Sequence, residues 1–80
     1  MLRLGKDSQQ NPEEVLEEAA SFFGSDGLGL ALMQSEDGSL IFEGGGGFVV
    51  VRARPQGKGS TVDIETREFE LDARRFLEHI

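Results

Sequence analysis

The sequence predicts an α+β domain of two layers, an antiparallel sheet with two helices on one face, in a single domain over residues 1–80. Three observations support this prediction. Residues 12–23 and 69–80 repeat apolar side chains at the spacing of amphipathic helices. The segments between them alternate apolar and polar residues, as strands with one buried face do. Glycine-containing turns separate these strands, so the expected order is β-α-β-β-β-β-α.

The composition is that of a folded domain rather than a disordered one. Apolar residues make up 38% of the 80-residue chain and charged residues 29%. No apolar run approaches the roughly 20 residues of a membrane span, and the first residues lack the apolar core of a signal peptide. We therefore expect a cytoplasmic protein. The chain has no cysteine, which excludes disulfides, thiolate catalysis and cysteine-ligated zinc.

The charge of the chain disfavours nucleic acid as a partner. Fifteen acidic residues against eight basic ones give a net charge of -7. Binding to a phosphate backbone requires clustered lysine and arginine, and only the pair Arg52 and Arg54 approaches such a cluster. We expect neither nucleic acid nor membrane to bind.

The first two elements are a strand and a helix. A strand is expected over residues 1–6, where two leucines alternate with Arg3. The helix begins after Asn11, whose side chain can accept a hydrogen bond from a free backbone N–H, and Pro12 suits its first turn. Gly24 is expected to end it. The apolar side chains on one side of this helix are Val15, Leu16, Ala19, Ala20, Phe22 and Phe23.

Four strands in a meander and a second helix complete the predicted fold. The strands are expected over residues 28–33, 40–43, 48–54 and 60–67. The tight turn Asp37-Gly38 joins the first pair, and Pro55 is expected to end the third strand. The side chains predicted to lie beneath the helices are Leu28, Leu30, Leu32, Leu40, Phe42, Val49, Val51, Val62 and Ile64. The last helix contributes a stripe formed by Phe69, Ala73, Phe76, Leu77 and Ile80.

The opposite face of the sheet is expected to be half apolar and half charged. Its apolar members are Gly29, Ala31, Met33, Ile41, Phe48 and Val50, and its polar members are Arg52, Arg54, Thr61, Asp63, Glu65 and Arg67. We expect the arginines to form cross-strand ion pairs with the acids, although they could instead hold an anionic ligand. A contiguous exposed apolar patch usually marks an interaction surface. The alternative is a plain monomer whose arginine and threonine side chains lie across the patch.

The motifs that resemble catalytic or ligand sites do not fit such sites. The run Gly44–Gly47 lies between two strands, without the helix N-terminus and lysine of a phosphate loop, so it predicts a hairpin turn. Its alternative role is a flexible lip beside a ligand. His79 is the only histidine and is expected on the surface. We therefore expect no catalytic residues, no cofactor and no metal site.

The strings FEGGGGFVVV (residues 42–51) and VDIETREFELDARRFL (residues 62–77) resemble a family of small bacterial proteins of unassigned function. The resemblance spans most of the chain. It implies the fold of the TATA-binding protein repeat, a β-α-β4-α unit. That protein reads DNA with a basic concave sheet and phenylalanine wedges, and Phe48 lies on the comparable face here. Asp63, Glu65 and the acidic net charge nevertheless oppose DNA binding.

These observations predict a non-enzymatic module that forms a homodimer or binds another protein through the uncovered sheet face. Its centre is formed by Ile41, Phe48 and Val50, with Arg52 and Arg54 at the rim. The alternative is a module of the helix-grip type that binds a small anionic or apolar metabolite near the glycine run and the two arginines. An enzyme is the least favoured interpretation, because no activated nucleophile or acid–base pair is evident.

Overall fold

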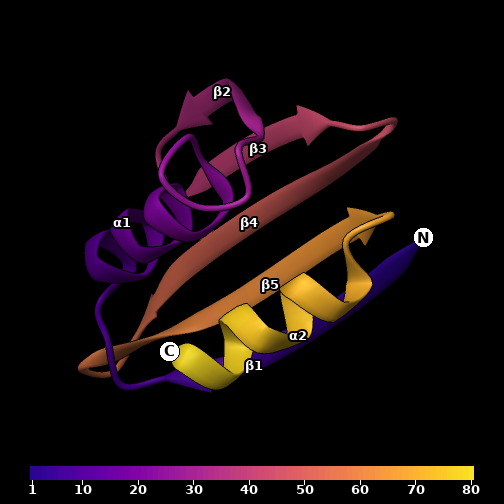
Figure 1. The fold of residues 1–80 in the computed structure, drawn as a ribbon. Coiled ribbons are helices and arrows are strands. Elements are labelled where there is room, and N and C mark those ends of the chain that lie inside the picture. The colour runs from indigo at the N-terminus through magenta and orange to yellow at the C-terminus, as the bar shows by residue number, and fades with distance from the viewer.

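A computed structural model describes the whole chain, Met1–Ile80, as an open antiparallel sheet with two helices on one face (Figure 1). The elements are β1 (Leu2–Ser8), α1 (Pro12–Phe23), β2 (Ala31–Glu36), β3 (Ser39–Gly44), β4 (Gly47–Gln56), β5 (Gly59–Arg67) and α2 (Glu70–His79). The predicted α+β class and element order are confirmed. Neither helix is long and apolar enough to cross a membrane.

The strand order is β1-β5-β4-β3-β2, and every neighbouring pair is antiparallel. The last four strands form the predicted meander, and β1 returns to the far edge beside β5. Helix α1 packs on β3, β4 and β5, while α2 packs on β1 and β5. Figure 1 shows both helices in front of the same sheet face. The other face is therefore left without cover from this chain.

A cluster of phenylalanines joins the helices to the sheet. Phe23, the last residue of α1, is fully buried, and its ring centroid lies 5.7 Å from that of Phe42 on β3 and 5.3 Å from that of Phe76 on α2. The rest of the buried core is formed by Val15, Ala19, Leu30, Leu40, Val49, Val51, Ala53, Val62, Ile64, Ala73 and Leu77. Burial of these side chains is the main stabilising contribution to the fold.

Two leucines predicted for the core are exposed instead. Leu28 lies in the turn after α1 and is 41% exposed, because β2 begins at Ala31 and not at residue 28. Leu32 does face the helix side, opposite the buried Phe42, but it is 50% exposed. It lies on β2, the outermost strand, which neither helix covers. The alternating pattern identified the face of Leu32 correctly but not the limit of the helical layer.

The prediction that Pro55 ends a strand is wrong. Strand β4 continues to Gln56, and Pro55 lies opposite Ser60 of β5. Strand β3 pairs with β4 only as far as the contact between Ser39 and Arg52. The Ala53 N–H still bonds to the Gly38 carbonyl, but beyond Ala53 β4 has a neighbour on one side only. An edge position tolerates a residue without a backbone N–H.

Two hydrogen bonds hold the C-terminal end of α2 against β1. The Lys6 ammonium donates to the Leu77 carbonyl over 2.6 Å, and the Ser8 hydroxyl donates to the Ile80 carbonyl over 3.0 Å. The last carbonyls of a helix lack partners within the helix, and a cation is favoured at that end. The edge strand therefore caps the helix.

The N-terminus of α1 carries the cap that the sequence predicts. The Asn11 side-chain oxygen accepts from the Glu14 backbone N–H over 2.9 Å, and the Glu14 carboxylate accepts from the Asn11 backbone N–H over 3.1 Å. Each group thus satisfies a backbone donor that the helix leaves unpaired.

Asn11→Ala is expected to lower the free energy of unfolding by about 1 kcal/mol, because it leaves the Glu14 N–H without its acceptor. Urea unfolding followed by circular dichroism measures the loss. The control is Gln9→Ala at an exposed position of the preceding loop, which should change stability by less than about 0.5 kcal/mol. Equal losses in the two variants would contradict a stabilising cap.

Candidate interaction face

The open face, defined as the sheet surface opposite the helices, has an apolar centre on β3 and β4. Ile41 lies directly opposite Val50, and Phe48 precedes Val50 by two residues on the same side of β4. All three side chains are half-buried although no helix lies above them. The structure therefore brings together the three central residues predicted from the sequence.

The rim of the open face is a lattice of ion pairs. Arg52 Nη1 lies 3.1 Å from Glu65 Oε1, and Arg54 Nη2 lies 3.3 Å from Asp63 Oδ2. The residues directly opposite are Asp63 for Arg52 and Thr61 for Arg54, so each arginine pairs diagonally. The predicted cross-strand pairing is confirmed. Exposed pairs of this kind contribute about 0–1 kcal/mol each, so they order the surface more than they stabilise it.

Arg3 is a member of this lattice that the sequence interpretation did not include. Its Nε lies 3.6 Å from Glu65 Oε1, the oxygen that also pairs with Arg52. The position follows from the pairing of β1 with β5, in which Arg3 lies directly opposite Glu65. The alternation of Leu2 and Leu4 places Arg3 on the opposite face, but pairing between the first and fifth strands was not apparent from the sequence.

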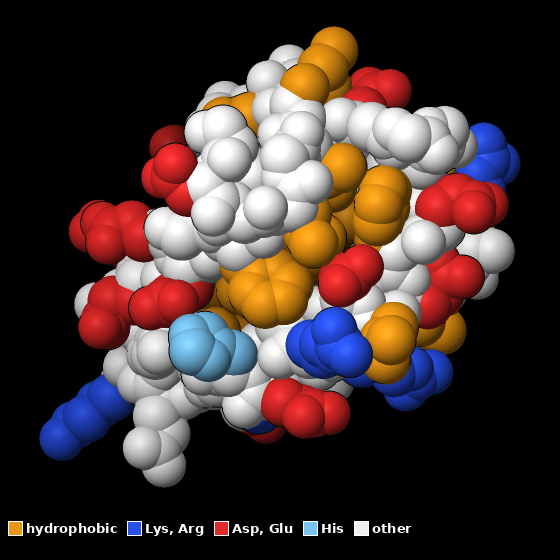
Figure 2. Space-filling model, viewed as in Figure 1, with side chains coloured by type: hydrophobic (Ala, Val, Ile, Leu, Met, Phe, Trp, Pro, Cys, Tyr) orange, Lys and Arg blue, Asp and Glu red, His pale blue; other side chains and the backbone are white.

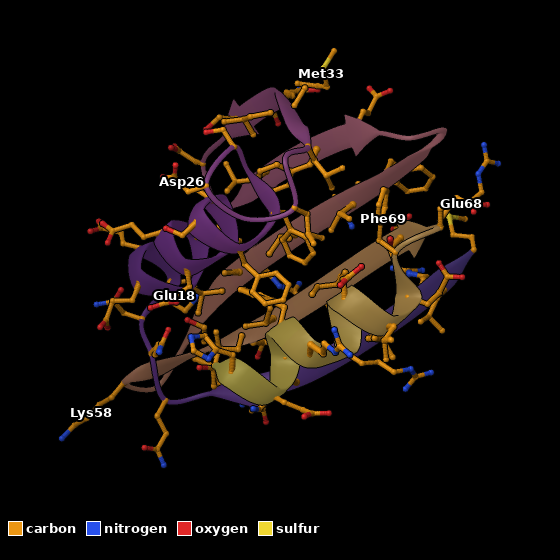
Figure 3. All side chains as sticks on the ribbon, in the orientation of Figure 1. Glu18, Asp26, Met33, Lys58, Glu68 and Phe69 are labelled. Atoms are coloured by element: carbon orange, nitrogen blue, oxygen red, sulfur yellow. The ribbon has the colours of Figure 1, made fainter.

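The apolar part of the open face is smaller than expected. Gly29 lies in the loop before β2, and the register shift between Leu32 and Gln34 makes Met33 a bulge residue. Gln34 therefore takes the position opposite Ile41. Met33 projects outward from the edge strand, away from the centre of the sheet (Figure 3). A bulge of this kind also disturbs the exposed edge, which discourages edge-to-edge pairing.

The glycine run is a hairpin turn, as predicted. Gly44 lies opposite Gly47, and the two loop residues have φ of 58° at Gly45 and 83° at Gly46. Positive φ at both loop residues is the geometry of a type I′ turn, and side chains other than glycine rarely adopt it.

The two flanking glycines have a different role, which is close packing. A Cβ at Gly47 would lie 2.2 Å from the Arg67 carbonyl oxygen, and a Cβ at Gly44 would lie 2.8 Å from a methyl group of Leu30. The turn accounts for Gly45 and Gly46, and the close approach of β5 accounts for Gly47, whereas the Leu30 methyl group near Gly44 can move aside. The fold itself therefore explains three of the four glycines.

The open face has two shallow depressions, one beside the arginine pair and one beside the glycine run. One, of about 770 Å³, is lined by the ion-pair lattice, including Arg52 and Arg54. The other, of about 540 Å³, lies beside Gly44, Gly46 and Gly47, with Ile41, Glu43, Phe48 and Arg67 around it. The glycine run and the arginine pair line different depressions, so no single depression joins them.

The helix side has a third depression, between the ends of the two helices. It measures about 350 Å³ and is lined by Glu18, Ser21, Phe22, Gly27, Leu28 and His79. Figure 2 shows hydrophobic side chains exposed in the hollow between the helices, with the histidine and acidic side chains beside it. His79 is exposed on the surface, as predicted, and its Nε2 lies 3.4 Å from Glu18 Oε2.

No group of three histidine, aspartate or glutamate side chains lies close enough together to hold a metal ion. The comparisons add no relative from which a role could be transferred: no protein-family model, curated protein or solved structure matches the chain. The candidate function therefore rests on the geometry of the open face.

Proposed function

We propose that this domain is a non-enzymatic protein-interaction module that associates through its open face. The observation that carries this proposal is the apolar centre of Ile41, Phe48 and Val50 on a sheet surface that neither helix covers. Apolar side chains grouped on an exposed rigid surface mark an interaction site, and aromatic residues contribute strongly at the centre of such sites. Arg52 and Arg54 would form part of the polar rim.

The scaffold beneath this centre supports the same proposal. Strand β4 is hydrogen-bonded to β3 on one side and to β5 on the other, so the backbone beneath Phe48 and Val50 is held on both sides. The Arg67 guanidinium carbon lies 6.0 Å from the centre of the Phe48 ring, within the range of a cation–π contact. The backbone of β4 therefore has little conformational freedom to lose on association, which favours binding.

The proposal includes a TATA-binding-protein-like fold, but not that protein's activity. The β-α-β4-α element order supports the fold resemblance. DNA binding would require arginines that are free to contact phosphates, whereas Arg3, Arg52 and Arg54 are each paired with a carboxylate of the same face. Fold alone says little about function.

Phe48→Asp is expected to weaken association through the open face by at least about 30-fold, since an aromatic residue at an interface centre contributes about 2 kcal/mol or more. Sedimentation equilibrium measures the change. Leu71→Asp is the matched control, because Leu71 is 62% exposed on α2, on the opposite side of the molecule. Phe48→Ser, which adds no charge, and circular dichroism of all variants separate loss of association from loss of folding. Unchanged association in both Phe48 variants would refute the proposed face.

A second candidate function, binding of a small apolar ligand, is favoured by the depression between the helices. Phe22 and Leu28 provide an apolar wall, and Glu18 and His79 provide polar groups at its rim. This role predicts that the purified protein retains a small molecule or is stabilised by one. Leu28→Asp should then abolish that stabilisation without affecting association through the open face.

A further inference from the structure

One row of side chains across the open face carries opposite charges on the two sides of an aromatic centre. Glu43 of β3, Phe48 of β4 and Arg67 of β5 lie directly opposite one another in register, with Phe48 in the middle. Ala31 of β2 extends the row beyond Glu43. The central aromatic side chain therefore has a carboxylate on one side and a guanidinium on the other.

Glu43 and Arg67 have no ion-pair partner within the chain. The ion pairs of the open face join Arg3, Arg52 and Arg54 to Asp63 and Glu65, and they leave Arg67 as the one arginine of this face without a carboxylate. Two strand spacings, about 9.6 Å, separate Glu43 from Arg67, too far for an ion pair. Both residues are exposed.

A two-fold axis converts this row into a set of matched contacts. If two open faces meet with the axis running along β4, the order of the strands is reversed in the second copy, so β3 of each copy lies against β5 of the other. The two Phe48 rings then meet at the axis, and so do the two copies of Arg52 and of Arg54, each of which keeps its carboxylate partner on β5 of its own chain. Glu43 of each copy comes opposite Arg67 of the other, and both unpaired charges find partners.

We propose that the partner of the open face is a second copy of this chain, held by Phe48 at the two-fold axis and by two Glu43–Arg67 contacts between copies. This inference rests on the proposed function, since it names the partner of the same face. It adds how the two copies are placed about a two-fold axis, whereas the proposed function names only the surface.

The distribution of charge favours a second copy over a strongly charged partner. The open face carries the arginines Arg3, Arg52, Arg54 and Arg67 and the acids Asp7, Glu36, Glu43, Asp63 and Glu65. Four positive and five negative charges leave this face nearly neutral in a chain of net charge -7. Acidic side chains gather instead along α1 on the other side (Figure 2). Two copies can therefore approach through their open faces with less repulsion than through the acidic helix side.

The dimensions of the face agree with those of a stable dimer. Five strands have four spacings of about 4.8 Å between them, about 19 Å in all, and the ten residues of β4 extend about 33 Å. An interface of standard size takes about 800 Å² from each partner. The open face offers an area of this order.

Charge reversal at the two unpaired positions tests the arrangement. Glu43→Arg alone and Arg67→Glu alone each place like charges opposite one another at both contacts, so each variant should associate at least about 10-fold more weakly than the unmodified chain. An equimolar mixture of the two variants restores opposite charges at both contacts. We expect the mixture to form a heterodimer, which native mass spectrometry resolves because the two variants differ in mass. The variant carrying both changes should form a homodimer again.

Glu17→Arg and Arg75→Glu, at exposed positions on the two helices, are the matched control pair and should remain dimeric singly. If Phe48→Asp prevents association but the mixed variants fail to pair, the two-fold arrangement is overturned while the open face stands as the interface. If neither Phe48→Asp nor the charge reversals alter the association of the chain, the proposed function fails as well. An unmodified chain that is monomeric at all concentrations would overturn the assignment of a second copy.

Discussion

Replacing Phe23 by alanine is expected to lower the free energy of unfolding by about 3–5 kcal/mol, the largest effect of any single substitution considered. The Phe23 ring is fully buried and lies between Phe22, Phe42 and Phe76, with ring centroids 5.0–5.7 Å away. Its removal would leave a cavity where α1, β3 and α2 meet. A domain of this size has about 4–12 kcal/mol of total stability, so the loss would consume much of it.

Urea unfolding at a fixed protein concentration measures this effect, since association would raise the apparent stability of any variant that still dimerises. Leu71→Ala is the control, because that side chain is 62% exposed and should contribute less than about 0.5 kcal/mol. A loss below about 1.5 kcal/mol at position 23 would show that the phenylalanine cluster does not hold the two layers together.

Gly47→Ala is expected to have the second largest effect on stability, a loss of about 2–3 kcal/mol. The added methyl carbon would lie 2.2 Å from the Arg67 carbonyl oxygen and 2.6 Å from Glu68 Cβ. Both contacts involve atoms that cannot rotate away, so β4 and β5 would have to separate. The displacement falls beside Phe48 and Arg67, which are the next residues in the register of these strands.

Gly46→Ala is the matched control within the same hairpin. At that position nothing lies within 4 Å of an added Cβ, and only the positive φ of 83° opposes the substitution. The expected loss of free energy of unfolding is about 1 kcal/mol. Equal losses at positions 46 and 47, measured by urea unfolding, would contradict the distinction between turn geometry and close packing. Gly47→Ala should also weaken association, whereas Gly46→Ala should affect it much less.

The sequence predicted most of the fold because its local signals agree with one another. Asn11 and Pro12 mark the start of α1, and the tight turn at Gly38 joins β2 to β3, where the alternating Leu40 and Phe42 are buried. The errors fall where long-range structure decides the outcome. Burial of Leu32 depends on how far the helices extend over the sheet, and tolerance of Pro55 depends on where β3 ends.

The candidate site was predicted less completely than the fold. Alternation along β3 and β4 places Ile41, Phe48 and Val50 on one face, so the apolar centre could be inferred from local sequence. Predicting that Arg3 joins the ion pairs of this face would require knowing that β1 pairs with β5. These two strands are about 60 residues apart in the sequence. Predicting that Glu43, Phe48 and Arg67 lie in one row would require the register of three strands. No local pattern in a single sequence contains that register.

A native mass spectrum of the purified chain and of its Phe48→Asp variant tests whether the open face joins two copies of the chain. The proposed interface predicts a mass of twice the 8.7 kDa of one chain for the unmodified protein, without added mass, and a single-chain mass for the variant. A single-chain mass for the unmodified protein would contradict the self-association proposed here. A single chain that retains a small molecule would instead support ligand binding in the depression between the helices.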